Sequence, residues 1–523
     1  MMNPFRIFCP VFFCILITSV QLSAQKGKRI EFKANNIRFD EHLGKKAKRL
    51  IGNVSFHHEG LKMTCDSAYQ YAESNTVDAF SNVVINQGDT AFGYGDALFY
   101  NGDSREFELK KNVRLKTSKA LLNSDYLHHD RNSRISSYHG GGTIRVHESN
   151  LDLTSEKGYY HHSNGDFFFR DSVLLVTPEV TIEADSLLYN VHSEITYFEG
   201  PTCITTAENS IYCEDGFYDK ISGKSEYIKN ARLDNAEQTM YGDFMTFDKK
   251  SGIGLIEGNV IIDDTSEHMI IEGEIANFYD IQDSAMISGQ PLMSKLMDED
   301  TLYMHADTFI VHQPKDAVDG KIIEALNQVK FFKEDLQGKC DTLIYPVEDS
   351  TIFMFGSPIL WSFENQITGD FISLFLQNEK IDHLYVQGNA FIVSEVDSIR
   401  YNQIRGKEMT GYFIHNELRK VDVNGNGQTI YYAQDDNDKF IGVNRGESSD
   451  LRILVNENKV DKIIMLNDPD ATLYPLKELS PSELRLKGFT WQTQFRPYNK
   501  QDVFVWERTS MVEIPKSGDG NSN

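Results

Sequence analysis

Two short phrases alternate along most of this 523-residue chain, and their spacing constrains the fold more than any other feature. The first phrase sets a Gly-Asn or similar pair between apolar residues, as in "LIGNVSF" at 50–56 and "IEGNVII" at 256–262. The second sets an Asp before apolar residues two and four positions later. From Asp66 to Asp243 the second phrase, weaker copies included, recurs at intervals of 30, 29, 31, 29, 30 and 28 residues. Such a period indicates a repeat architecture.

Each repeat unit reads as two β-strands joined by tight turns. Turn-forming sequences follow both phrases, for example "NGDS" at 101–104 and "NQGD" at 86–89. Strands joined this closely pair as antiparallel neighbours. The sequence therefore predicts an all-β chain in which strands stack in chain order into one long antiparallel sheet.

The alternation of apolar residues changes at the Asp of the second phrase. Apolar or small residues lie one and three positions before it, but two and four positions after it. A switch of this kind is typical of a bulge or sharp corner, which turns the side chains on both sides of it to one face. The predicted corner residues are Asp66, Asp96, Asp125, Asp185, Asp243, Asp307, Asp341 and Asp370.

The same alternation predicts which side chains face inward. On the inner side of the bent sheet it places an apolar surface, with polar residues outside. The residues expected to line this inner groove are Leu98, Tyr100, Val113, Leu115, Val173, Leu175, Leu187, Tyr189, Met245, Phe247, Val260 and Ile262.

Composition changes divide the chain into four parts. Residues 1–24 have a basic residue, an apolar run and the small-residue ending "QLSA", which is typical of a secretory signal peptide. Residues 25–393 hold the regular repeat, and residues 394–475 continue it less regularly. In residues 476–523 the repeat stops; we expect a short capped helix at 480–486, then a cap for the end of the sheet and a polar tail.

Charge and cysteine content exclude several kinds of function. The net charge of −25 leaves no basic surface for nucleic acid, so no DNA or RNA partner is expected. Cys203 and Cys213 flank a hairpin-like stretch symmetrically and predict a candidate disulfide, the alternative being two small buried strand residues. Neither spacing nor motif predicts a metal site, a cofactor or catalytic residues.

The alternating phrases "EADSLLY", "YGDFMTF" and "IEGNVII", behind a signal peptide, resemble the OstA-like family, which includes periplasmic lipopolysaccharide-transport proteins. The resemblance extends over roughly residues 30–475. It implies a jelly-roll sheet folded into an open, V-shaped groove whose apolar inner face shields acyl chains. It also implies lipopolysaccharide or a related glycolipid as ligand.

From this resemblance and the apolar inner face, we expect a non-enzymatic lipid-binding and transport protein of outer-membrane assembly. Its location would be the periplasm, with or without association with the outer membrane. Unpaired strand edges at the ends of a repeat sheet predict pairing with other transport components or with a second copy. The alternative hypothesis is a structural or adhesion repeat protein without a lipid ligand.

Overall fold

The computed structural model describes residues 29–508 except for 41–46, 87–90, 118–119, 147–149, 281–282, 298–299, 314–319, 378–379, 415–416, 436, 438 and 457–458. The expected signal peptide at 1–24 lies outside the described residues. The chain divides into two compact units, residues 1–163 and 164–523, and each is described by itself. Within the described ranges, no helix is long and apolar enough to cross a membrane.

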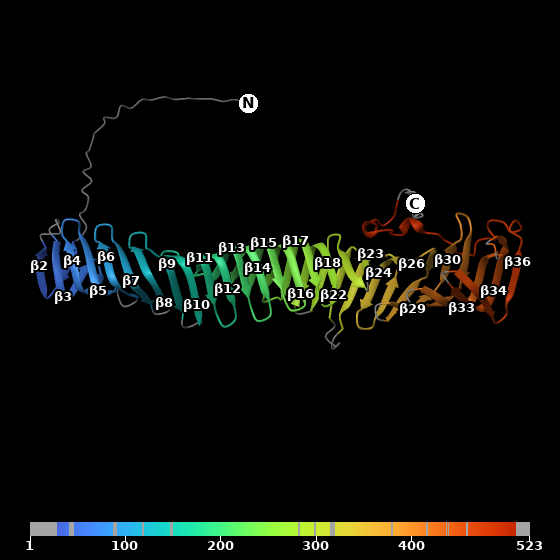
Figure 1. The fold of residues 1–523 in the computed structure, drawn as a ribbon, viewed down its shortest axis with the longest axis horizontal. Helices are drawn as coiled ribbons and strands as arrows, with labels where there is room; N and C mark the ends of the chain where they lie inside the picture. The colour runs from blue at the N-terminus through green and yellow to red at the C-terminus, as the bar shows by residue number, and fades with distance from the viewer. Residues whose placement is uncertain are drawn as a thin grey trace, which may run out of the picture. The chain divides into compact units, whose positions relative to one another are not determined.

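Unit 1 is a run of antiparallel strands in chain order, coloured blue to teal in Figure 1. β1 and β2 both pair with β3, and from β3 onward each strand pairs with the next. Its strands are β1 (Glu31–Lys33), β2 (Asn36–Asp40), β3 (Ala47–His58), β4 (Leu61–Tyr71), β5 (Thr76–Asn86), β6 (Ala91–Asn101), β7 (Glu106–Thr117), β8 (Ala120–Asp130), β9 (Ile135–Val146) and β10 (Leu151–His161).

Unit 2 continues the same construction over more strands. They are β11 (Asp166–Val176), β12 (Thr181–Asn190), β13 (Ile195–Thr205), β14 (Ser210–Asp219), β15 (Lys224–Asp234), β16 (Gln238–Asp248), β17 (Ile253–Asp264), β18 (Met269–Tyr279), β19 (Ser284–Ser288), β20 (Leu292–Met297), β21 (Asp300–His305), β22 (Thr308–His312), β23 (Ile322–Lys333), β24 (Leu336–Pro346), β25 (Thr351–Phe355), β26 (Ile359–Ser362), β27 (Asn365–Thr368), β28 (Phe371–Gln377), β29 (Lys380–Gln387), β30 (Phe391–Glu395), β31 (Tyr401–Arg405), β32 (Glu408–Ile414), β33 (Glu417–Gln434), β34 (Phe440–Asn456), β35 (Lys459–Leu466) and β36 (Asp470–Tyr474). Two 3₁₀ turns follow, η3 (Thr493–Phe495) and η4 (Lys500–Phe504).

From β11 to β18 each strand pairs with the next, as in unit 1. Further on, several strands are split in two at the corner, so that β19 and β20 both pair with β18. The expected antiparallel all-β repeat with two strands per unit is confirmed.

The Gly-Asn pair forms one side of each corner. In β17, Gly258 and Asn259 adopt left-handed backbone angles, with φ of 74° and 48°, and both drop out of the pairing with β18. Gly and Asn are the residues that adopt this conformation most readily. The Asn259 side chain donates a hydrogen bond of 2.8 Å to Asp243 on β16. The same bond joins Asn82 to Asp66, Asn112 to Asp96 and Asn389 to Asp370.

The Asp forms the other side of the corner. On its strand one residue is left out of the pairing, whereas two are left out on the Gly-Asn strand. On β4, Met63 and Cys65 are buried before Asp66, and Ala68 is buried after it. The alternation switches there, so both arms of the strand turn their apolar side chains inward. Asp66, Asp96, Asp125, Asp185, Asp243, Asp307, Asp341 and Asp370 are all exposed, on the outside of the corners.

The corners divide each unit into two walls. Wall 1 holds the arms that precede a Gly-Asn corner or follow an Asp corner, such as residues 253–257 of β17; wall 2 holds the others, such as 260–264. Ile256 of wall 1 and Val260 of wall 2 belong to one core cluster in unit 2. In unit 1, Leu109 of wall 1 and Val113 of wall 2 likewise belong to one core cluster, which is separate from that of unit 2. The apolar core therefore lies between two walls that face each other.

Residues 476–508, which we call the strap, depart from the expected end cap. The strap runs back across the strands of unit 2, along the outer face of wall 2 (Figure 1, red). Gln403 of β31 accepts a 2.8 Å bond from the Leu486 amide and donates one of 2.9 Å to the Leu484 carbonyl. Farther along, Arg496 donates to Gln337 of β24, and Lys330 of β23 donates to the Val505 carbonyl.

The strap lies there because the outer face of wall 2 is apolar beneath it. Phe391 and Tyr432 are 4% and 5% exposed and form a cluster with Leu486 of the strap, although they point away from the core between the walls. Without cover, these side chains would contact water. At 480–486 the expected helix is a single turn, in which Glu483 accepts hydrogen bonds from the amide and hydroxyl of Ser480.

Candidate functional site: the inner face of the walls

The twelve side chains expected to face inward are distributed between closed and open parts of the inner face. Eight are buried, namely Leu98, Tyr100, Val113, Val173, Leu187, Met245, Val260 and Ile262. Leu115, Leu175 and Tyr189 are half-buried, and Phe247 is 38% exposed. The degree of cover depends on whether the tips of the two walls, which border the mouth of the inner face, meet.

In unit 1 the mouth is bridged. His58, at the wall 2 end of β3, lies 2.6 Å from the Tyr100 hydroxyl of wall 1, and both side chains are 2% exposed. In the turns just beyond, Glu59 forms an ion pair of 3.0 Å with Arg105, and its carbonyl accepts a bond from Arg131. The walls of β3–β8 therefore enclose a dry core.

The first strands of unit 2, β11–β16, are less covered, and we call them the open stretch. Close to the corners, inner side chains such as Leu187 and Met245 are 2% and 5% exposed. Toward the tips cover decreases: Leu175 and Tyr189 are half-buried, and Phe247 is 38% exposed. Large inner apolar side chains in contact with water at a mouth are typical of a groove that accepts an apolar ligand.

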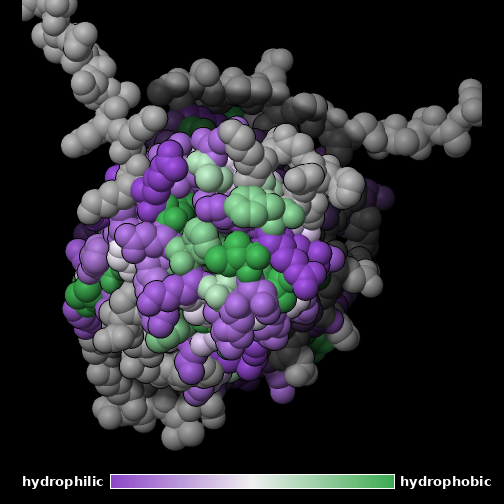
Figure 2. Space-filling model, turned by 90° about the vertical axis from the view of Figure 1, so that its left-hand side faces the viewer, coloured by the Kyte–Doolittle hydropathy of each residue, from purple (hydrophilic) through white to green (hydrophobic). Residues whose placement is uncertain are grey.

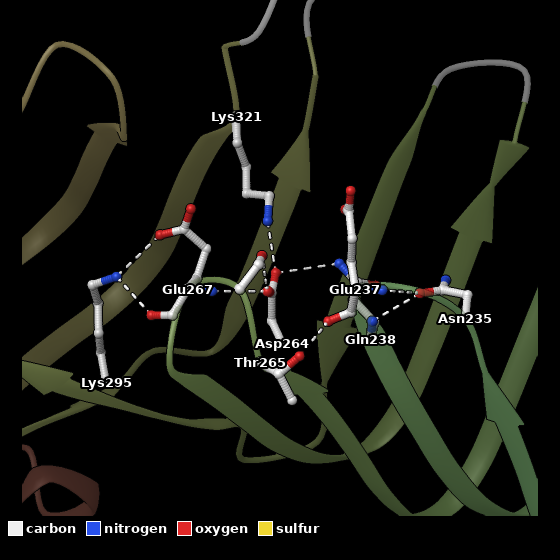
Figure 3. Close-up of polar contacts among 9 residues, drawn as sticks. Asn235, Glu237, Gln238, Asp264, Thr265, Glu267, Lys295 and Lys321 are labelled. Carbon is white, nitrogen blue, oxygen red and sulfur yellow. Dashed lines mark hydrogen bonds and ion pairs between the residues drawn. The ribbon is translucent and has the colours of Figure 1, made fainter.

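Beyond the open stretch, charged side chains bridge the mouth of unit 2 (Figure 3). Asp264, at the wall 2 end of β17, is 2% exposed and lies 2.6 Å from the Lys321 ammonium at the start of β23 in wall 1. Lys295 of β20, 8% exposed, donates to the carbonyl and carboxylate of Glu267 at 3.0 and 3.2 Å. The Asp264–Lys321 pair holds the two walls together where the core cluster of unit 2 becomes fully buried, while the Lys295–Glu267 contact lies within wall 2.

The Asp264 carboxyl is ionised at neutral pH. Burial raises its pKa, but hydrogen bonds from Lys321, from the Ser266 hydroxyl and from the Glu267 amide act in the opposite direction and together outweigh it. The net result is a pKa below the ordinary value of an aspartate. The pair therefore stays charged, and separating the walls would leave Lys321 or Asp264 without its partner.

Sequence reasoning missed this bridge, although a signal for it exists. Asp264 and Lys295 occupy inner positions by the alternation rule, since Asp264 follows Val260 and Ile262 at intervals of two residues. A charged residue at an inner position needs a partner. What the sequence does not show is that Lys321 supplies it from 57 residues away.

The candidate disulfide between Cys203 and Cys213 is not formed. Both thiols are free, and the hairpin pairs Cys203 with Tyr212 and Thr202 with Cys213. This offset of one residue sends Cys213 to the inner face, where it is buried, while Cys203 joins the outer row of wall 2. There Cys203 lines a shallow surface hollow with Leu174, Glu183 and Tyr212.

Three of the described cysteines, Cys65, Cys213 and Cys340, are buried. Burial raises the pKa of Cys65 and Cys213 to about 11 and that of Cys340 to about 12, so these thiols are poor nucleophiles. Among the described side chains, no group of three or more His, Cys, Asp or Glu residues is placed to hold a metal ion.

Two segments of the chain match known protein families. Residues 27–185 match the family described as OstA-like protein, and residues 297–380 match the family described as LptA/(LptD N-terminal domain) LPS transport protein. Over these segments the chain is similar to OstA-like proteins and to proteins of lipopolysaccharide transport. The first segment spans β1–β11 and the first half of β12, and the second spans β21–β28, so both units contain a matched segment.

A search of solved structures finds LptH of Pseudomonas aeruginosa, described as the LptA homologous periplasmic component of the lipopolysaccharide transport device. The similarity has 13% sequence identity and a TM-score of 0.18, and covers 19% of this chain and 77% of the other. At that TM-score it adds no weight to the assignment. Among curated proteins, no match is found.

Proposed function

We propose that this OstA-like chain binds lipopolysaccharide or a related glycolipid and passes it on during outer-membrane assembly, in the periplasm or in association with the outer membrane. The acyl chains would lie between the walls of the open stretch. The observation that carries the proposal is the inner face of β11–β16, where Leu175, Tyr189 and Phe247 line a mouth that is not fully covered. An acyl chain placed there gains about 0.8 kcal/mol for each methylene removed from water.

The structure offers a matched pair of sites for testing this. Phe247 and Tyr241 lie on the same strand, β16, and are 38% and 39% exposed. By the alternation rule the Phe247 side chain lies on the inner face of wall 1. Tyr241 lies on the outer face of wall 2, because its neighbours in the chain, Met240 and Gly242, take the inner positions. A photo-crosslinking amino acid at either position therefore reports on one face at equal exposure.

After irradiation in cells, we expect lipid adducts on the Phe247 variant and none on the Tyr241 variant, as detected by mass spectrometry of the purified chain. Equal labelling at both sites would mean non-specific contact with lipid. Absence of adducts at Phe247 in a folded protein would favour the alternative, a structural or adhesion protein. The dry core of β3–β8 supports that alternative, because a fully packed interior needs no ligand.

We propose further that the first strands of unit 1 pair with another transport component or with a second copy. Among the described strands, β1 and β2 pair only with β3, and Ile37 and Phe39 of β2 are 52% and 73% exposed. Figure 2 shows hydrophobic residues gathered in the middle of this end with hydrophilic ones around them. An open edge with apolar side chains favours strand addition.

Light scattering over a range of protein concentrations tests the second-copy form. Phe39→Arg should lower the average mass, while Ile270→Arg, an exposed outer position on β18 away from this edge, should not. Association that is unchanged in Phe39→Arg would remove this edge from the interface.

A further inference from the structure

The two rims of the open stretch differ in charge, because lysines are present in the turns of only one of them. On the wall 2 side, the three turns that join β11–β12, β13–β14 and β15–β16 each contain one exposed glutamate: Glu179, Glu208 and Glu237. On the wall 1 side, the turns that join β14–β15 and β16–β17 contain the exposed lysines Lys220, Lys249 and Lys250, and a fourth, Lys224, begins β15. The chain as a whole has a net charge of −25, so a cluster of lysines beside the open mouth differs from the rest of its sequence.

The acidic residues in the lysine turns are engaged with the backbone. Asp219 accepts bonds from the amides of Ile221 and Ser222 at 2.9 and 3.0 Å. Asp248 accepts from the amides of Lys250 and Ser251 at 2.9 and 3.3 Å. These carboxylates shape the turns and point at amides. The Lys220 ammonium forms an ion pair of 3.0 Å with Glu194, and the Lys250 ammonium donates to the Ile221 carbonyl at 2.8 Å, while all four lysines stay on the exposed surface of the rim.

Apolar side chains are exposed among the same lysines. Val191, Ile221, Phe247 and Ile253 are 36%, 60%, 38% and 48% exposed, and all lie in or next to the wall 1 turns of β12–β17. A surface that mixes exposed aliphatic or aromatic groups with lysines is typical of contact with anionic amphiphiles, because it offers both parts of the ligand a partner.

The lysines also lie near the groove itself. Phe247 directly precedes the Asp248 turn, so Lys249 and Lys250 follow an inner side chain by two and three residues. Lys220 and Glu194 both lie near Tyr189, another inner side chain, whose pKa is raised chiefly by burial. Acyl chains between the walls would thus bring a head group to this rim.

We infer that Lys224, Lys249 and Lys250 on the wall 1 rim bind the phosphate or carboxylate of the amphiphile's head group. The inference rests on the proposed function and adds an orientation to it. The anionic head lies over wall 1, because the glutamates of wall 2 repel it, and the acyl chains extend toward the corners. The ligand is a lipid head group, so the acyl chains contribute to its affinity.

The test uses two fluorescent lipids of identical acyl composition, phosphatidic acid and phosphatidylcholine, with the purified full chain. The wild type should bind the anionic lipid about tenfold more tightly at low salt, and Lys249→Gln with Lys250→Gln should remove that preference while leaving phosphatidylcholine binding unchanged. The matched control, Lys62→Gln with Lys116→Gln, makes the same charge change at exposed positions of wall 2 in unit 1 and should keep the preference.

Retention of the preference in the Lys249/Lys250 variant would overturn the rim assignment. Equal affinity of the wild type for the two lipids would overturn it as well, with lipid binding still in place. Failure of the wild type to bind either lipid would instead overturn the proposed function. Competition by inorganic phosphate at concentrations that match the lipid would show a free-anion site and would also reject a lipid head group as the ligand.

Discussion

The contact between Gln366 and the strap gives the sharpest quantitative test of this fold. Gln366 of β27 is 1% exposed, and its side-chain amide bonds to the strap backbone. Its oxygen accepts a bond of 2.7 Å from the backbone N–H of Gln492, and its nitrogen donates one of 2.9 Å to the Thr490 carbonyl. The Trp361 indole also donates to its oxygen at 3.3 Å. Gln366→Ala removes all three bonds at once.

The expected cost follows from what remains. Two N–H groups and one carbonyl lose a partner in a region shielded from water, and each such loss costs about 1 kcal/mol or more. We therefore expect the strap to be destabilised by about 3 kcal/mol, which raises the population with an open strap by roughly 100-fold. Gln366→Glu should fall between, because it retains the acceptor and loses the donor.

The chain contains its own reporter. Its three tryptophans, Trp361, Trp491 and Trp506, all lie in the strap or beneath it, so intrinsic fluorescence reports strap release in urea. Hydrogen exchange at the amides of the strap gives the same free energy without denaturant. Gln387→Ala, at an exposed position of wall 1, is the control and should change neither measurement. Exchange rates in Gln366→Ala equal to those of the wild type would refute the reasoning.

Three further changes test the walls and corners. Leu187→Asp places a charge at a 2% exposed inner position and should cost several kcal/mol, seen as a lower urea midpoint; a wild-type midpoint would reject its inward placement. His129 has its pKa lowered to about 4 by burial and by the nearby charges of His162 and Arg131. The stability that depends on neutral His129, about 3 kcal/mol, is present above pH 6.5 and is lost as the pH falls toward 4. Hydrogen exchange in β8 should therefore become faster over that range in the wild type, but not in His129→Gln. Asn259→Ala places alanine at a left-handed backbone position and removes the bond to Asp243, so it should lower the free energy of unfolding in urea by about 2 kcal/mol. Asn259→Gly should lower it less, because glycine adopts this backbone angle without strain. Equal losses in the two variants would mean that the backbone angle contributes nothing.

The fold was predictable because its signals are local and repeated. The corner at Asp66 shows in the sequence as a change of alternation, and the neighbouring repeats show it again, so a single misread unit does not alter the conclusion. The inner position of Leu187 follows from the same rule. The rule states which face a side chain takes, but not how closely the opposite wall approaches. Phe247 and Tyr100 both obey it, yet one is 38% and the other 2% exposed.

What the sequence did not show depends on contacts between distant residues. The strap has no period, and its buried partners, such as Gln366 and Gln403, read as ordinary outward polar residues. The candidate disulfide does not form for a simpler reason: symmetry about Glu208 does not determine the strand register, and the hairpin pairs Cys203 with Tyr212, the residue before Cys213.

The order of strands has a consequence for how the chain acquires its structure. Nearly every strand pairs with a neighbour close in sequence, so growth from the N-terminus needs only short loops to close, and each new hairpin finds its template already formed. The strap is the exception. Its contacts reach back 81 residues to Gln403, 124 to Gln366, 159 to Gln337 and 175 to Lys330. The strap can dock only after β23–β31 have formed. Once docked, it joins the last part of unit 2 to the middle of that unit. Strands that formed one after another can then unfold only together.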